Sequence, residues 1–119
     1  MLTNNILVMT NYSAKFAVDY IEGGYFDVLT RARDLVHCGH KLLTHPLSGS
    51  VKPNETPYKS ILLSAKKQSL DFDSLKIIEN SITLYSSFEK RNIPDSYLEN
   101  LQEVDLTLIN SAITSHMKK

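Results

Sequence analysis

The segment "YFDVLTRARDLVHCG", residues 25–39, decides how this sequence can fold. Charged residues such as Arg31 and Asp34 fall on one side of a helical wheel, and apolar residues fall on the other. Gly39 stands where helices commonly end in a residue of positive φ. The pattern predicts an amphipathic helix that begins at Tyr25 and has one apolar stripe: Val28, Leu29, Ala32, Leu35 and Val36.

Short apolar runs typical of strands lie on both sides of this helix. Residues 6–10, "ILVMT", resemble a strand buried on both faces, and residues 18–24, "VDYIEGG", resemble a second strand that stops at two glycines. Beyond the helix, residues 40–46, "HKLLTHP", predict a third strand closed by Pro46. Residues 58–65, "YKSILLSA", predict a fourth.

The remaining sequence predicts two helices. Residues 70–92 offer Asp73 or Ser74 as an N-cap, and residues 93–119 contain Pro94 at a good first helical position. We therefore expect one α/β domain over residues 1–119, with two helices at its C-terminus. Its sheet should have about four strands, mostly parallel and flanked by helices, with the fourth strand able to return antiparallel at an edge.

The composition excludes several classes of partner. Thirteen Lys and Arg residues balance thirteen Asp and Glu residues, so no overall charge attracts nucleic acid or anionic lipid. The apolar runs are much shorter than the ~20 residues that span a bilayer, and the N-terminal segment lacks the features of a signal peptide. Cys38 is the only cysteine, which agrees with a reducing compartment. We expect a cytoplasmic protein that binds neither membranes nor nucleic acid.

A long polar segment, "HPLSGSVKPNETPYKS", separates the third and fourth predicted strands; we call residues 45–60 the polar loop. Its Ser-Gly-Ser sequence could cup an anion with backbone N–H groups, and two lysines could add charge. It lacks the spacing of a nucleotide-binding P-loop. The alternative is a surface connector held by Pro53 and Pro57, with a turn at Asn54. Long connections without secondary structure are often functional, so both interpretations stay open.

Ligands of parallel sheets bind at the carboxyl ends of the strands, and this edge is where we expect the site. His45 could act there as a general acid or base oriented by Glu22, or could simply order its own turn. The sequence leaves open whether the protein is an enzyme. The predicted binding residues come from the strand ends and the polar loop: Thr10, Asn11, Thr44, Ser48, Gly49, Ser50, Lys52, Asn54, Tyr58 and Lys59.

The sequence "HCGH", residues 37–40, does not predict a metal site. Neighbouring helical residues such as His37 and Cys38 point about 100° apart, and the sequence contains no second cysteine for a zinc site. We expect helix-terminal histidines, a half-buried inert thiol and neither a metal nor a cofactor. Asp71 and Asp73 are interpreted as helix-capping residues rather than as paired catalytic carboxylates.

Residues 20–29, "YIEGGYFDVL", followed by "RDLVHCGHKLLTHPLSGSVKPNETPYKS", residues 33–60, resemble the GrdX family. The resemblance spans roughly residues 18–64, and the polar loop is its most distinctive part. Members are small proteins encoded beside the glycine, sarcosine and betaine reductase components of amino-acid-fermenting anaerobes. The resemblance implies a cytoplasmic role in the assembly or regulation of such a reductase, and it brings no catalytic residues.

Three functions follow from these observations. The first is an accessory protein that binds a reductase component or a small anionic ligand through the polar loop. The second is a small enzyme that acts on a carboxylate or phosphate metabolite with His45 and Glu22. The third is a homodimeric interaction module, because the apolar stripe of the last helix is wider than one packing face needs: Leu98, Leu101, Leu106, Leu108, Ile109 and Ile113.

Overall fold

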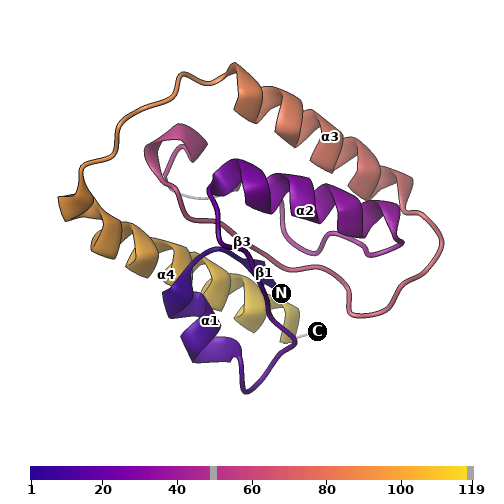
Figure 1. Ribbon diagram of the computed structural model, residues 1–119. Coiled ribbons are helices and arrows are strands. Elements are labelled where there is room, and N and C mark those ends of the chain that lie inside the picture. Colours follow the sequence, from indigo (N-terminus) through magenta and orange to yellow (C-terminus); the bar gives the residue numbers. More distant parts are fainter. Residues whose placement is uncertain (49–50, 118–119) are drawn as a thin grey trace.

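A small mixed sheet lies between two pairs of helices in the computed structural model, which describes residues 1–48 and 51–117 (Figure 1). The helices α2 and α3 cover one side of the sheet, and α1 and α4 cover the other. The α/β class is therefore confirmed. The helices and strands of the described residues are α1 (Ile6–Tyr12), α2 (Tyr25–His37), α3 (Phe72–Ser87), α4 (Leu98–Met117), β1 (Leu2–Thr3), β2 (Asp19–Tyr20) and β3 (Ser60–Ile61), with 3-10 turns η1 (Pro53–Glu55) and η2 (Asp95–Tyr97).

The sheet is smaller and less parallel than expected. Its strand order within the described residues is β2-β1-β3, with β1 parallel to β2 and antiparallel to β3. The expected antiparallel return after the polar loop is thus confirmed. Residues 40–46 contribute only a bridge between Leu42 and Leu63 in the described structure, so the third predicted strand is wrong. The four-stranded, mostly parallel sheet is replaced by a short mixed one.

Residues 6–10, predicted as the first strand, are helical. The Asn5 side chain accepts a hydrogen bond from the Leu7 N–H at 3.1 Å and caps α1. Only part of α1 packs inside the protein: Val8 is fully buried, whereas Ile6 is 46% exposed. The strand itself lies upstream, at Leu2–Thr3. An apolar run of this length fits either element, and the cap residue before it decides in favour of the helix.

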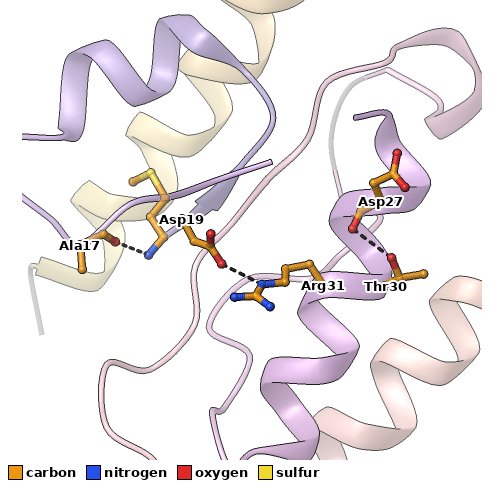
Figure 2. A network of polar contacts seen from close by, with 6 residues as sticks. Ala17, Asp19, Asp27, Thr30 and Arg31 are labelled. Carbon is orange, nitrogen blue, oxygen red and sulfur yellow. Dashed lines mark hydrogen bonds and ion pairs between the residues drawn. The ribbon is translucent and has the colours of Figure 1, made fainter. Parts of the chain in front are cut away.

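The strand β2 is tied to its neighbours by polar contacts at the protein surface (Figure 2). The Met1 amine donates a hydrogen bond to the Ala17 carbonyl at 2.9 Å, and the Arg31 guanidinium contacts the Asp19 carboxylate at 2.9 Å. Both members of this ion pair are substantially exposed, so it adds at most about 1 kcal/mol to stability. The ion pair joins β2 to α2, and β2 is also paired with β1.

The helix α2 begins at Tyr25 and ends at His37, as its apolar stripe predicts. Gly39 has a φ of 104°, and the chain turns there in a Schellman motif. The Gly39 N–H donates to the Val36 carbonyl, and the His40 N–H donates to the Leu35 carbonyl, both at 3.0 Å. The prediction for this helix and its end is confirmed.

Two apolar clusters, one on each side of the sheet, hold the layers together. The larger one joins the stripe of α2 to the sheet and to Ile78 of α3. The smaller one joins Val8 of α1 and Leu62 to Ile109 and Ile113 of α4. Leu106 packs against this smaller cluster, so much of the apolar width of α4 is used inside the molecule. Self-association through α4 stays a prediction, and less exposed apolar surface of α4 is left for it than the sequence suggests.

The N-cap of α3 is Asp71, two residues before Asp73 and three before Ser74, the expected caps. The Asp71 carboxylate accepts hydrogen bonds from the Ser74 hydroxyl at 2.5 Å and from the Ser74 N–H at 3.1 Å. The hydroxyl contact is the main reason that the pKa of Asp71 lies below the usual aspartate range. The capping role expected for Asp71 is confirmed.

Asp71→Ala should lower the melting temperature, because two donors of the first turn lose their acceptor. A carboxylate with a lowered folded-state pKa stabilises the protein above its unfolded pKa and loses this effect as the pH falls through the folded value. The difference from the parent should therefore begin to shrink as the pH drops below about 4 and become smallest below the lowered folded-state pKa. Thermal melts across pH test this, with the exposed Asp73→Ala as the control; a pH-independent difference would contradict the prediction.

Candidate functional site

Three hydrogen bonds hold the base of the polar loop: two come from distant parts of the chain, and one joins the two arms of the loop. The Tyr25 hydroxyl donates to the Pro46 carbonyl at 3.0 Å. The Lys59 amine donates to the Ser48 carbonyl, and the Asn4 side chain donates to the Pro57 carbonyl, each at 2.7 Å. Gly49 and Ser50 lie outside the described residues. These bonds fix both arms of the loop against the sheet and the start of α2.

A cleft of about 750 Å³ opens beside the loop; we call it the aromatic cleft. Its volume lies within the range of small-molecule sites. Tyr25 stacks on Tyr85 with 5.0 Å between ring centroids, and Phe26 lies 6.2 Å from the same ring. Burial is the main cause that raises the pKa of Tyr85. The lining residues come from α2, the polar loop, α3 and the α3–α4 connection: Gly24, Tyr25, Phe26, Pro53, Asn54, Thr56, Pro57, Tyr85, Ser86, Phe88, Glu89, Lys90, Arg91, Asn92 and Ile93.

The α3–α4 connection passes outside the segment that contains η1 (Figure 1). Its residues Phe88–Ile93 line the aromatic cleft. The Asn54 amide donates to the Glu89 carbonyl at 3.0 Å, and Arg91 lies 4.0 Å from the Glu55 carboxylate. The other side-chain atom of Asn54, Oδ1, is buried and has no hydrogen-bond partner in the described structure. The walls of the cleft therefore contain aromatic side chains, the cations Lys90 and Arg91, the acid Glu89 and the buried acceptor of Asn54.

A second, narrow hollow is lined by Lys59 and by other residues of the loop and of α4; we call it the Lys59 cavity. Its volume is about 20 Å³, which is room for roughly one water molecule. Lys59 is only 7% exposed, and burial lowers its pKa to about 8 despite the opposing effect of Asp105. The cavity is lined by the following residues: Tyr25, Ser48, Val51, Thr56, Tyr58, Lys59, Leu101, Val104, Asp105 and Leu108.

Asp105 joins α4 to the sheet through a buried hydrogen-bond network. Its Oδ2 atom accepts from the Ser60 hydroxyl at 2.7 Å and from the Asn5 amide at 3.1 Å. The Ser60 hydroxyl also lies 2.7 Å from the Thr3 hydroxyl. Asp105 is 6% exposed, so these contacts replace the water that the carboxylate loses on folding. Asp105 supports the wall of the Lys59 cavity.

The structure does not bring the expected strand-end residues to one edge. Thr10 and Asn11 lie exposed on α1, where the Asn11 amide donates to the Leu7 carbonyl of the same helix at 2.7 Å. Their predicted place at the end of a strand is wrong, because α1 is a helix. Glu22 and His45 are exposed, and no hydrogen bond or ion pair joins them within the described residues. The His45 imidazole instead accepts from the Leu47 N–H at 3.1 Å.

The remaining predicted binding residues lie on or beside the loop. Thr44 accepts from the Leu62 N–H at 3.0 Å, which ties the loop to the segment after β3. Ser48 and Lys52 are exposed, and Tyr58 lines the Lys59 cavity. Lys59 differs from the expectation of an accessible loop cation, because its amine is enclosed and bound to the loop backbone. Lys52, rather than Lys59, is therefore the accessible cation of the loop.

The histidines of residues 37–40 make separate contacts. His37 lies 3.5 Å from the Glu79 carboxylate, and His40 lies 2.7 Å from the Ser64 carbonyl. Cys38 is exposed, which corrects the expected half-buried thiol. The described ranges contain no cluster of three or more histidine, cysteine, aspartate or glutamate side chains that could hold a metal ion.

The sequence contains a signal that Asp105 is buried, although Asp105 is not one of the apolar residues named for the last helix. Leu101, Asp105 and Ile109 follow one another at four-residue spacing, so the carboxylate falls on the buried face of α4. An acidic residue at such a position needs a buried partner. Asn5, which caps α1, and Ser60 of β3 supply these partners, and both are buried.

These elements define a small α/β protein with an aromatic cleft beside an anchored polar loop. The chain belongs to the GrdX-like protein family, whose model matches residues 1–114. Neither the curated proteins nor the solved structures compared with this chain show a significant match. Among the described residues, no helix combines the length and the apolar character needed to cross a bilayer.

Proposed function

We propose that the protein is an accessory protein of the glycine reductase system that binds a reductase component through the aromatic cleft and the polar loop. Membership of the GrdX-like family supports the setting. The observation that carries the proposal is that the polar loop, the most distinctive segment of the sequence, forms one wall of a cleft lined by four aromatic residues: Tyr25, Phe26, Tyr85 and Phe88.

The chemistry of the cleft favours an extended acidic segment of the partner. Aromatic side chains supply large contact areas with few degrees of freedom to lose, and they dominate the affinity of many interfaces. Lys90 and Arg91 line the cleft together with one acid, Glu89, and Lys52 is exposed on the loop, so cations outnumber acids among these residues even with Glu55 beside Arg91. These cations would attract carboxylates and orient them. The alternative ligand is a small anion bound by the same residues, and a binding titration tests this alternative as well.

Phe26→Ala should weaken binding of the reductase component about fivefold or more, because truncating an aromatic anchor costs more than about 1 kcal/mol of binding free energy. Phe26 is 44% exposed, so the change should leave the fold intact. Isothermal titration with each purified reductase component, and in parallel with phosphate and glycine, measures the affinity. The partner that binds in these titrations identifies the ligand class.

Phe72→Ala is the matched control. Phe72 is 73% exposed and lies at the start of α3, and it is not among the residues that line the cleft. Its truncation should leave affinity unchanged. Equal affinities of the parent, Phe26→Ala and Phe72→Ala proteins would show that the aromatic cleft is not the binding surface.

A further inference from the structure

The α3–α4 connection, residues 88–94, is a wall that two clefts share. Arg91, Asn92 and Ile93 line the aromatic cleft, and the same residues line a neighbouring hollow of about 390 Å³, which we call the second cleft. The two clefts therefore lie on either side of one short stretch of chain. The other residues of the second cleft come from the polar loop, the end of the connection, η2 and α4: Val51, Glu55, Pro94, Tyr97, Asn100, Leu101 and Val104.

Few contacts hold the connection in its place. The Asn54 amide donates to the Glu89 carbonyl at 3.0 Å, and Arg91 lies 4.0 Å from the Glu55 carboxylate. Both members of this ion pair are substantially exposed, so it adds little stability. Within residues 1–48 and 51–117, no residue of the connection belongs to either apolar cluster. These clusters instead hold α3 and α4 to the sheet, so the connection can move while both helices stay in place.

The Asn54 side chain opposes the closed position of the connection as well as holding it. Because its Nδ2 atom is bonded to the Glu89 carbonyl, the amide is fixed in an orientation that leaves Oδ1 enclosed and without a hydrogen-bond partner in the described structure. An enclosed acceptor without a donor destabilises the state that encloses it, and this offsets part of the gain from the bond. Release of the connection allows the amide to rotate and Oδ1 to reach water. We therefore expect the closed state to be only slightly favoured over an open one.

We propose that the α3–α4 connection opens and joins the two clefts into one groove, which receives a single extended segment of the partner. The identity of this occupant rests on the proposed function. The closed connection blocks the passage of a chain from one cleft to the other, because three of its residues form the common wall. Opening therefore controls access to the binding surface.

The two halves of the joined groove suit different side chains of the segment. Lys90 and Arg91 attract acidic side chains to the aromatic cleft. In the second cleft the charges of Arg91 and Glu55 lie beside each other and balance, and Tyr97 is 58% exposed. The second cleft therefore fits an uncharged apolar side chain. The segment that fits the whole groove has acidic residues at one end and an apolar residue at the other.

Trypsin digestion of the protein without a partner tests whether the connection opens. An open connection exposes the peptide bonds after residues 90 and 91, and the rate of cleavage reports the population of the open state. Asn54→Asp replaces the amide donor by a carboxylate that repels the Glu89 carbonyl. It should raise cleavage at residues 90–91 about fivefold or more relative to cleavage at the exposed residues 66–67, because one hydrogen bond is lost.

Asn80→Asp is the matched control, because it adds the same charge at an exposed position of α3. Its cleavage ratio should equal that of the parent. An equal ratio in the Asn54→Asp protein would show that the contact to Glu89 does not hold the connection closed, and the proposal would be overturned.

The role in binding is tested by the rate of association with each purified reductase component, measured at about 0.5 M salt, where the added charge is largely screened. Asn54→Asp should associate faster than Asn80→Asp by about the same factor as its cleavage ratio, because the partner binds only the open state. A raised cleavage ratio with an unchanged association rate would overturn this control of access. Failure of the parent to bind any component would contradict the proposed function and the occupant, whereas the cleavage ratio would still decide whether the connection opens.

Discussion

Asp105→Ala should lower the free energy of unfolding by about 3 kcal/mol, as measured by urea denaturation. The substitution removes two buried hydrogen bonds to a carboxylate, one from Ser60 and one from Asn5. Hydrogen bonds to charged groups each contribute about 1.5–3 kcal/mol, and Ser60 can retain its contact with Thr3. The change also removes the nearest compensating charge from the enclosed Lys59. We therefore expect a large loss from one side chain on the buried face of α4.

Two variants separate the role of this network from the general effect of altering α4. Glu103 is an exposed acid of the same helix, so Glu103→Ala should change the unfolding free energy by less than about 0.5 kcal/mol. Asp105→Asn keeps the shape and one acceptor oxygen and should cost roughly half as much as the alanine substitution. If Asp105→Ala is as mild as Glu103→Ala, the buried network does not hold α4 to the sheet.

The second large effect is expected at the end of α2, where Gly39→Ala should cost about 2–4 kcal/mol of stability. Gly39 has a φ of 104°, a conformation that L-residues adopt only with strain. A Cβ atom there would also collide with the backbone of Gln68, whose N–H donates to the Gly39 carbonyl at 3.0 Å. Strain and collision add, because neither the turn nor the backbone of residue 68 can move independently.

Gly24→Ala is the control for this prediction. Gly24 has a φ of −90°, and a Cβ atom there would approach the Asp27 carboxylate no closer than 4.0 Å. Its substitution should leave the urea midpoint nearly unchanged. Equal destabilisation by the two glycine substitutions would show that the cost at residue 39 is not due to its conformation.

The helices could be predicted from sequence better than the sheet, for a physical reason. The stripe of α2 and the stop at Gly39 are local signals, and each was sufficient by itself. The strands β1, β2 and β3 are each two residues long, too short for alternating patterns to develop. Their pairing depends on contacts between distant residues, such as Leu2 with Ile61. The apolar run 6–10 therefore fits a strand pattern, although Asn5 caps a helix there.

The site was predictable in part. The composition of the polar loop indicates one part of the site, because Pro53 and Asn54 of the loop line the aromatic cleft. The other walls come from the start of α2 and from residues 85–93, and no local pattern relates these segments to the loop. The burial of Lys59 could not be predicted from the sequence, because a lysine between Tyr58 and Ser60 is expected to be exposed. Burial of that amine depends on Asp105 and α4, far along the chain.

The central claim, that the aromatic cleft and the polar loop bind a reductase component, is tested most directly by hydrogen–deuterium exchange of the protein with and without each component. A bound partner slows exchange of the amides that it covers, and mass spectrometry assigns them to peptides. The account predicts slower exchange in residues 51–58 and 85–93, with α1 unchanged. Slower exchange confined to α1 or to the middle of α3, or no change with any component, would contradict it.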